Sequence, residues 1–235
     1  MMSMFISITR KLLFKHKASS KAYIEYLRNK GAQIGEDVTI YSPNQTYIDE
    51  QFPYMLKIGN HVNITLGVHI LNHDYSWAVL KQCSGNVFGG VGYVNIGNNV
   101  FIGVNSVILM NTNIGSNVII GAGSIVHGNV PNNCVVAGNP AKIICSIDEF
   151  MQKRRVKQYN EAAEMVRRYR SVFGKEPPKE KLPAYFFLFE PRKLPINSTF
   201  LSRMKLTGNY DQSLDVFFKS RPMFKDYEDF LNSVK

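Results

Sequence analysis

The sequence VNIGNNVFIGVNSVILMNTNIGSNVIIGAGSIVHGNV occupies residues 94–130 and repeats with a period of six. An aliphatic residue returns at every sixth position: Ile96, Ile102, Ile108, Ile114, Ile120 and Val126. Four residues after each of them stands a small or β-branched one: Val100, Ser106, Thr112, Val118, Ser124 and Val130. A period of six fits neither an amphipathic helix nor an alternating strand, so it indicates a repeat architecture.

A narrow triangular prism explains this pattern. Each flat face admits one aliphatic side chain and one compact neighbour, and the tight corners favour Gly or Asn. Three hexads make one coil, so stacked coils place Ile96 over Ile114, Ile102 over Ile120 and Ile108 over Val126. An earlier block keeps the same register: Ile34, Val38, Ile40, Ile58, Val62, Ile64, Val68 and Ile70. One coil cannot bury its own aliphatic row, so several are required. The period does not give the hand of the coil.

Two stretches break the six-residue rule. Residues 42–56 contain Pro43 and Pro53 and are expected to form either a distorted coil or a loop. Residues 75–93 are predicted to be a long loop that follows the only His-Asp pair and carries the only tryptophan, Trp77. Long excursions from a rigid scaffold often hold function, and a mobile arm that reaches over a neighbouring subunit suits this composition.

The prism is expected to have a helical extension at each end. Residues 1–31 are predicted to be a basic helical lead-in, with Ser19 or Ser20 as the N-cap, before the prism of residues 32–145. Residues 146–235 are predicted to form a helical, aromatic-rich extension whose first helix opens on a capping box at Ser146–Glu149. The apolar face of residues 1–14 allows weak association with a membrane surface.

Composition limits the class of function. The chain has 235 residues and 45% hydrophobic content, so it is a folded protein. It contains no apolar run long enough for a membrane span, and we expect a cytoplasmic location. The net charge of +10 suggests an anionic partner, but the region between Asn86 and Ala141 has no Lys or Arg, which argues against nucleic acid. The three cysteines are expected to be free thiols.

The repeat, together with GVHILNHDYSW at residues 67–77 and VVAGNPAKII at residues 135–144, resembles the hexapeptide-repeat acyltransferase superfamily. Within it, the sequence is most similar to the maltose/galactoside and capsular-polysaccharide O-acetyltransferase branch. The resemblance covers about residues 30–145. It implies a left-handed parallel β-helix, a homotrimer with active sites between subunits, and acetyl-CoA as the donor.

His73 is the expected general base, because imidazole has a suitable pKa for removing a hydroxyl proton as that oxygen attacks a thioester. It ends the coil where the long loop departs, and NHDYSW resembles the position of the family's catalytic histidine. Either Asp74 or Asp49 would orient its ring. Of the other histidines, His16 lies in the basic lead-in and is the least promising as a base. His61 and His69 are expected to be surface residues, and His127 is expected to be exposed or near the cofactor.

The remaining candidates concern the donor, the acceptor and the oxyanion. Asn72, Asn44 or main-chain amides would stabilise the oxyanion, and the resemblance suggests Asn44 as the acceptor-site Asn. Trp77 is a further candidate for binding the acceptor. Small residues at Gly103 and Gly121 would let CoA lie against the backbone. The resemblance assigns CoA contacts to Val104, Ala122 and Lys142. Gly128 replaces a common family lysine, so one phosphate contact is either missing or supplied by His127 or the basic C-terminal helix.

These observations favour a CoA-dependent O-acetyltransferase that acts on a sugar hydroxyl of a surface glycan precursor or small saccharide. An amino-sugar N-acetyltransferase is the alternative within this class. A metal-dependent hydratase like the γ-class carbonic anhydrases shares the prism, but the spacing of His69 and His73 is one residue too short, and no metal is expected. A scaffold without catalytic activity is the third alternative.

Overall fold

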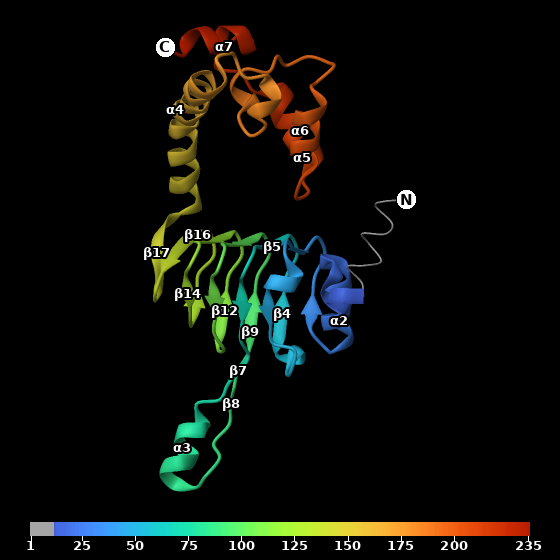
Figure 1. The fold of residues 1–235 in the computed structure, drawn as a ribbon, viewed down its shortest axis with the longest axis vertical. Helices are drawn as coiled ribbons and strands as arrows, with labels where there is room; N and C mark the ends of the chain where they lie inside the picture. Colours follow the sequence, from blue (N-terminus) through green and yellow to red (C-terminus); the bar gives the residue numbers. More distant parts are fainter. Residues whose placement is uncertain (1–11) are drawn as a thin grey trace. The chain divides into compact units, whose positions relative to one another are not determined.

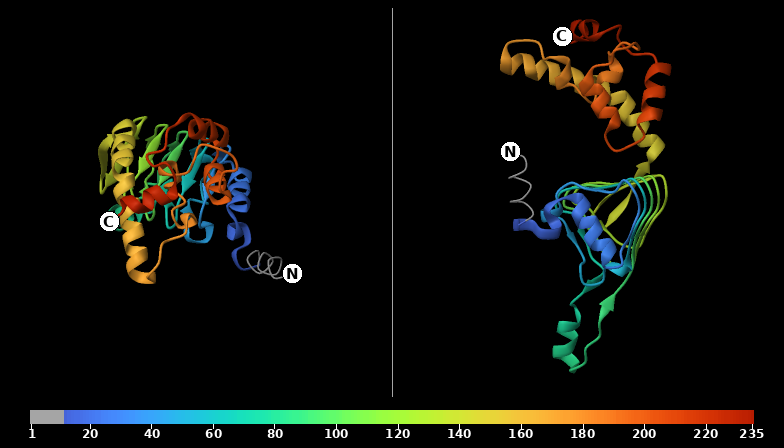
Figure 2. Two further views of the ribbon diagram at one scale, coloured as in Figure 1. Left: turned by 90° about the horizontal axis from the view of Figure 1, so that it is seen from above. Right: turned by 90° about the vertical axis from the view of Figure 1, so that its right-hand side faces the viewer.

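A computed structural model describes residues 12–235 as two compact units that divide after Phe150. The first unit is a left-handed parallel β-helix with a triangular cross-section (Figure 2, right). Its strands form three stacked sheets, one on each side of the triangle (Figure 1). The predicted architecture is confirmed.

Sheet A has the order β1-β4-β9-β12-β15, sheet B the order β17-β16-β13-β10-β5-β2, and sheet C the order β14-β11-β6-β3. The strands of sheet A are β1 (Gln33–Ile34), β4 (Leu56–Ile58), β9 (Val94–Ile96), β12 (Thr112–Ile114) and β15 (Asn129–Val130). Those of sheet B are β2 (Thr39–Ile40), β5 (Val62–Ile64), β10 (Val100–Ile102), β13 (Val118–Ile120), β16 (Cys134–Gly138) and β17 (Ala141–Ser146). Those of sheet C are β3 (Tyr47–Ile48), β6 (His69–Ile70), β11 (Val107–Ile108) and β14 (Ile125–Val126).

The register agrees with the hexad prediction. Ile96 pairs with Ile114, Ile102 with Ile120, and Ile108 with Val126. The six aliphatic positions and the six compact ones are all buried. At the corners, asparagines take the left-handed backbone conformation that their short polar side chains tolerate: Asn99, Asn105, Asn111, Asn117 and Asn133.

Both ends of the prism core are covered. At the N-terminal end lie the 3-10 turn η1 (Lys15–Ala18) and helix α2 (Ser20–Asn29), whose Tyr23 and Leu27 enter the prism core. Ser19 caps α2 by accepting the amide of Ala22 at 3.2 Å. At the other end, β17 pairs antiparallel with β16. Capping of this kind prevents the last coil from exposing its apolar row. The apolar face expected at Met4, Phe5 and Ile8 lies outside the described residues.

Both irregular stretches contain more structure than a loop. Residues 42–56 form a distorted coil in which two 3-10 turns, η2 (Pro43–Gln45) and η3 (Pro53–Met55), flank β3. The prediction of an irregular loop over residues 75–93 is wrong in part, because helix α3 (Trp77–Ser84) lies within it. The strands β7 (His73–Asp74) and β8 (Gly90–Val91) pair antiparallel and carry α3 away from the prism (Figure 1).

The second unit is helical and has its own aromatic core. It comprises α4 (Ile147–Phe173, which begins in the first unit), α5 (Ser198–Lys205), α6 (Tyr210–Lys219) and α7 (Tyr227–Ser233), with 3-10 turns η4 (Lys179–Lys181) and η5 (Phe186–Leu188). The predicted capping box is present, since Ser146 Oγ accepts the amide of Glu149 at 3.1 Å. The core is built largely from the buried phenylalanines Phe186, Phe189, Phe200, Phe217 and Phe230.

Candidate functional site

The candidate site lies at the edge of the prism where the chain passes from sheet C to sheet A, which we call the histidine edge (residues 71–74, 109–111 and 127). His73 belongs to β7 and is held there by the main-chain pairing with Val91. A cavity of about 180 Å³ opens beside it and is lined by Leu71, His73, Asp74, Leu109, Met110, Asn111 and His127. Three successive coils therefore contribute to one pocket.

His73 and Asp49 form a hydrogen-bonded pair through Nδ1 of the ring and Oδ2 of the carboxylate. Their side chains are 10% and 1% exposed. When Nδ1 carries the proton and donates it to Asp49, Nε2 is left as an unprotonated acceptor. The pair thus fixes both the ring orientation and the tautomer that a general base requires.

Asp49 is buried but well supplied with donors. Its Oδ1 accepts the amide of Gln51 at 2.9 Å, and its Oδ2 accepts the amide of Asn72 at 3.1 Å. These hydrogen bonds replace the water that a buried carboxylate loses. It follows β3 in the distorted coil, where its own amide donates to the Ile70 carbonyl at 3.0 Å. The main chain of the neighbouring coil therefore locks this residue beside His73.

Asp74, the other candidate for orienting His73, makes different contacts. Its Oδ1 accepts the amide of Ser76 at 2.8 Å, and hydrogen bonds from Ser76 hold the pKa of Asp74 below its usual value. Successive strand residues point to opposite sides, so Asp74 cannot share Asp49's position on the ring. The structure brings Asp49, not Asp74, to His73 Nδ1, although Asp74 does line the same pocket.

Asn72 is placed differently from the sequence expectation of a substrate or oxyanion contact. It is fully buried, and its Nδ2 donates to the Phe52 carbonyl at 3.0 Å. Its main-chain carbonyl accepts the amide of Gly92 at 2.8 Å. Its Oδ1 is the one buried side-chain N or O atom without a partner among residues 12–235. Burial removes Asn72 from the surface that an acceptor would touch. Its main-chain bond with Gly92 instead joins the two ends of the segment from β7 to β8 (residues 73–91), which we call the arm.

Aromatic rings enclose His73, and sequence reasoning missed two of them. Phe52 and Tyr75 stand edge-on to the imidazole at 5.2 and 5.1 Å between centroids. Trp77 is one ring further out, 5.9 Å from Tyr75. The Tyr75 hydroxyl donates to Gln51 Oε1 at 3.0 Å. The signal available in the sequence was the clustering of Phe52 and Tyr75 next to the breaks in the repeat.

The residues expected to bind CoA lie mainly on another edge, where the chain passes from sheet B to sheet C. We call it the glycine edge (residues 103–104 and 121–123). Gly103 packs so closely on the next coil that an added Cβ would lie 2.5 Å from the Ala122 nitrogen. Val104 and Ala122 are exposed there, and Lys142 on β17 lies opposite Ala137, one coil beyond Gly121.

Within one chain, His127 and Asn44 each lie on a different edge of the prism from the residues expected to act with them. His127, expected to be exposed or near the cofactor, is exposed and lines the pocket of His73 on the histidine edge. Asn44, expected in the acceptor site, is exposed in η2 between β2 and β3, which places it on the glycine-edge side of its coil. In one chain, sheet C separates these two edges. Among residues 12–235, no group of three or more His, Cys, Asp or Glu residues is arranged to hold a metal ion.

A second, partly buried network adjoins the site from η1 and α2. Glu50 bonds with Lys17 Nζ at 3.0 Å and with the Tyr23 hydroxyl at 3.0 Å, and His16 approaches it at 3.3 Å. The same Tyr23 hydroxyl donates to the Ile48 carbonyl at 3.3 Å. These contacts hold β3 immediately before Asp49.

No helix among the described residues has the length and apolarity that a membrane crossing would need.

Comparison with known proteins found no matching family model. The chain is 44% identical over 127 residues to Protein CapG of Staphylococcus aureus, covering 54% of this chain and 73% of CapG. It is 35% identical over 105 residues to YvoF of Bacillus subtilis strain 168, which is named as a candidate acetyltransferase, covering 45% of this chain and 56% of YvoF. Among solved structures, the hexapeptide-repeat acetyltransferase VCA0836 of Vibrio cholerae is 20% identical with a TM-score of 0.45, covering 60% of this chain and 88% of that one.

Proposed function

Since the chain belongs to the hexapeptide-repeat acyltransferase superfamily and is an acetyltransferase, we propose that it moves an acetyl group from acetyl-CoA to a sugar hydroxyl, with His73 as general base. The observation that carries this proposal is the buried His73–Asp49 pair facing an open pocket. The acceptor is a saccharide or a glycan precursor. We place the reaction in the cytoplasm, where the three free cysteines stay reduced.

The reaction proceeds by direct transfer. His73 Nε2 removes the proton of the acceptor hydroxyl as that oxygen attacks the thioester carbonyl. Asp49 stabilises the imidazolium that forms. Because Asn72 is buried, main-chain amides of a neighbouring coil or the exposed Asn44 are the remaining donors for the oxyanion. When the tetrahedral intermediate collapses, the C–S bond breaks and the His73 proton passes to the departing thiolate.

A complete site requires two copies of the chain, and we propose a homotrimer. His73 and the expected CoA residues Gly103 and Ala122 lie on different edges of one prism, so each histidine edge meets the glycine edge of a neighbour. Apolar residues exposed on the arm support this assembly: Val79 at 67%, Val87 at 60% and Phe88 at 59%. The arm packs on the neighbouring copy, and Lys142 contacts a CoA phosphate.

The test compares two His–Asp pairs in the same protein. His61 pairs with Asp37 at 3.3 Å at an exposed corner, with side chains 50% and 64% exposed. We expect His73→Asn to reduce release of free CoA about 10²- to 10⁴-fold, and His61→Asn to leave it unchanged. The acceptor panel contains maltose, galactosides and glucosamine. Acetylation of glucosamine alone, on nitrogen, would replace the O-acetyl assignment, and unchanged activity of His73→Asn would refute the role of His73.

A further inference from the structure

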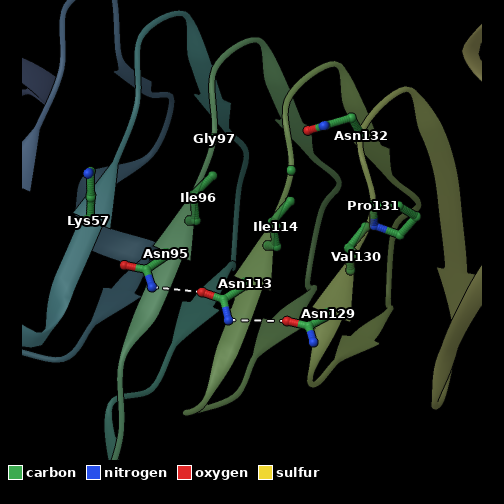
Figure 3. Close-up of a pocket in the computed structure, with 11 residues that line it drawn as sticks. Lys57, Asn95, Ile96, Gly97, Asn113, Ile114, Asn129, Val130, Pro131 and Asn132 are labelled. Atoms are coloured by element: carbon green, nitrogen blue, oxygen red, sulfur yellow. Dashed lines mark hydrogen bonds between the residues drawn. The ribbon is translucent and has the colours of Figure 1, made fainter.

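The outer face of sheet A carries a row of amide side chains. Lys57, Asn95, Asn113 and Asn129 lie side by side in register on four successive strands. Asn95 Nδ2 donates to Asn113 Oδ1 at 2.7 Å, and Asn113 Nδ2 donates to Asn129 Oδ1 at 3.2 Å (Figure 3). Each amide nitrogen has two hydrogens and each oxygen two lone pairs, so every rung keeps donors or acceptors that the row does not use.

The row borders a broad open groove of about 720 Å³, which we call the amide groove. Gly97 and Gly115 also line it, as do Pro131 and Asn132, which follow Asn129 and Val130 along the chain (Figure 3). Lys57 is the one charged residue among those that line it, and they include no Asp or Glu. The groove therefore offers repeated amide groups and a single cation to its occupant.

The other two faces of the prism differ from sheet A. Outward residues of sheets B and C include Phe101 at 43% exposure, Tyr47 at 42%, and the half-buried Ile119, Val107 and Ile125. Apolar faces such as these are suited to contact between copies of the chain. The outward row of sheet A contains only amides and Lys57, preceded by Gln33, which pairs with Lys57. Sheet A is thus the face suited to a polar ligand.

The amide groove adjoins the pocket of His73. Asn111 lines that pocket and Asn113, two residues further along the same coil, lines the groove. In the next coil, His127 lines the pocket and Asn129 the groove. Asn111 and His127 stand at the corner of the prism, and each is only two residues before the groove residue of its coil, so the pocket and the groove lie next to each other on both coils. A chain molecule seated in the groove can therefore place one of its units at His73.

We infer that the amide groove binds an extended oligosaccharide, with Lys57 meeting a carboxylate of an acidic sugar, and so presents one sugar of a longer acceptor to His73. This inference rests on the proposed function and deepens it. Sugar hydroxyls donate and accept hydrogen bonds, as the free positions of the amide row require. Successive rungs are about 4.8 Å apart, the spacing of paired strands. That step is close to the advance of one pyranose in an extended glycan.

Binding is measured without acetyl-CoA, on the His73→Asn protein, so that the result does not depend on catalysis. The probes are hexagalacturonate, monomeric galacturonic acid and maltohexaose, and the readout is the NMR signals of the side-chain amides. We expect hexagalacturonate to shift the signals of Asn95, Asn113 and Asn129, and to bind at least about tenfold more tightly than the monomer. No shift of these signals with either hexasaccharide would overturn the inference.

Variants then identify the contacts. We expect Lys57→Ala and Asn113→Ala each to weaken hexagalacturonate binding about two- to tenfold, the effect of losing one hydrogen bond or ion pair. Asn63→Ala is the matched control, since Asn63 points outward from sheet B and bonds with the Tyr41 hydroxyl at 3.1 Å. Equal weakening by Asn63→Ala would overturn the assignment. Loss of the oligomer in Lys57→Ala would instead make sheet A a contact between copies and would also overturn it.

In the transfer assay, the inference predicts a change in selectivity. Lys57→Ala should lower kcat/KM for a uronic-acid hexasaccharide about two- to tenfold and leave kcat/KM for a monosaccharide acceptor unchanged. An equal loss of kcat/KM for both acceptors would overturn the inference that the amide groove binds the longer acceptor. Absence of transfer to every acceptor in the wild-type protein would contradict the proposed function alone.

Discussion

The prism and the C-terminal unit bury their cores in different ways. In the prism, each core residue lies over its equivalent in the next coil, as Ile64, Ile102 and Ile120 do in sheet B. In the C-terminal unit, rings far apart in the sequence meet without a period, as Phe186 stacks on Phe200 at 4.6 Å between centroids. The first core is a sum of nearest-neighbour contacts, and the second is a single cluster. A repeat therefore reveals its contacts in the sequence, whereas a cluster does not.

The largest expected effect comes from making a cavity in each core. Ile102 and Phe200 are both fully buried. We expect Ile102→Ala and Phe200→Ala each to lower the free energy of unfolding by about 2–5 kcal/mol, because each removes buried apolar atoms and leaves a gap. In the prism, the loss should reach the flanking coils, whose strands pair directly with β10.

Hydrogen exchange measures these losses residue by residue. Ile102→Ala should reduce protection of the amides in β5 and β13 as well as in β10, and Phe200→Ala should reduce it among α4, α5 and α6. Val156→Ala is the control, because Val156 is 75% exposed on α4. Protection lost in β10 alone would mean that the coils do not stabilise one another.

The difference between the two cores also explains which parts of the fold were predictable. The sequence indicates the pairs Ile96–Ile114 and Ile108–Val126 because one hexad rule fixes both position and partner. Capping of α4 was predictable because Ser146 and Glu149 are local partners. The packing of Phe186 on Phe200 was not, since nothing in the composition of the tail says which rings meet. Helix α3 was missed because its arm has no core of its own to impose a pattern.

The sequence predicted best those residues of the candidate site whose positions the hexad repeat fixes. His73 marks the point where the hexads stop, and NHDYSW resembles the position of the family's catalytic histidine, so it was a candidate from the sequence. Asp49 remained one of two candidates because Pro43 and Pro53 interrupt the six-residue pattern of its coil. In the structure, 3-10 turns lie on both sides of β3, and β3 still pairs in register with β6. The placement of His127 on the histidine edge follows from three-sided topology, since its corner joins sheet C to sheet A. Phe52 and Tyr75 enclose His73 through contacts that no spacing encodes.

A smaller effect is expected from adding one methyl group in each unit. At Gly103, a Cβ would lie 2.5 Å from the Ala122 nitrogen and 2.7 Å from the Ile120 carbonyl oxygen. These are backbone atoms of the next coil, so Gly103→Ala should cost about 1–3 kcal/mol. Gly174, which ends α4, has a φ of +62° and open space around its Cβ position, so Gly174→Ala should cost about 1 kcal/mol from backbone strain alone.

Urea unfolding of the two glycine variants gives these costs. The order of the two is the informative result, because the prism coils pack backbone against backbone and the helix end does not. A larger loss for Gly174→Ala than for Gly103→Ala would contradict the tight stacking inferred at the glycine edge.

The smallest effect concerns two carboxylates whose pKa values are both lowered. Burial raises the pKa of Glu50, but the hydrogen bond and charge of Lys17, with bonds from Tyr23 and His16, lower it by more, so that the pKa lies below its usual value. The pKa of Glu161 is lowered mainly by its hydrogen bonds with Arg154, at 2.7 and 2.6 Å. Ionised Glu50 therefore stabilises the prism, and Glu161 does the same at a more exposed site of the C-terminal unit.

The sign of the pH dependence follows from the lowered pKa. The stabilisation by Glu50 is fully present above its unfolded pKa near 4.5 and is lost as the pH falls through the lower folded pKa. We expect Glu50→Gln to be about 1 kcal/mol less stable than the wild-type protein at pH 7, with the difference disappearing below that folded pKa. Glu161→Gln should show a smaller difference with the same sign. A Glu50→Gln difference that grows on acidification would mean that Lys17 and Tyr23 do not favour the charged carboxylate, and the link between α2 and the coil of Asp49 would then depend on packing alone.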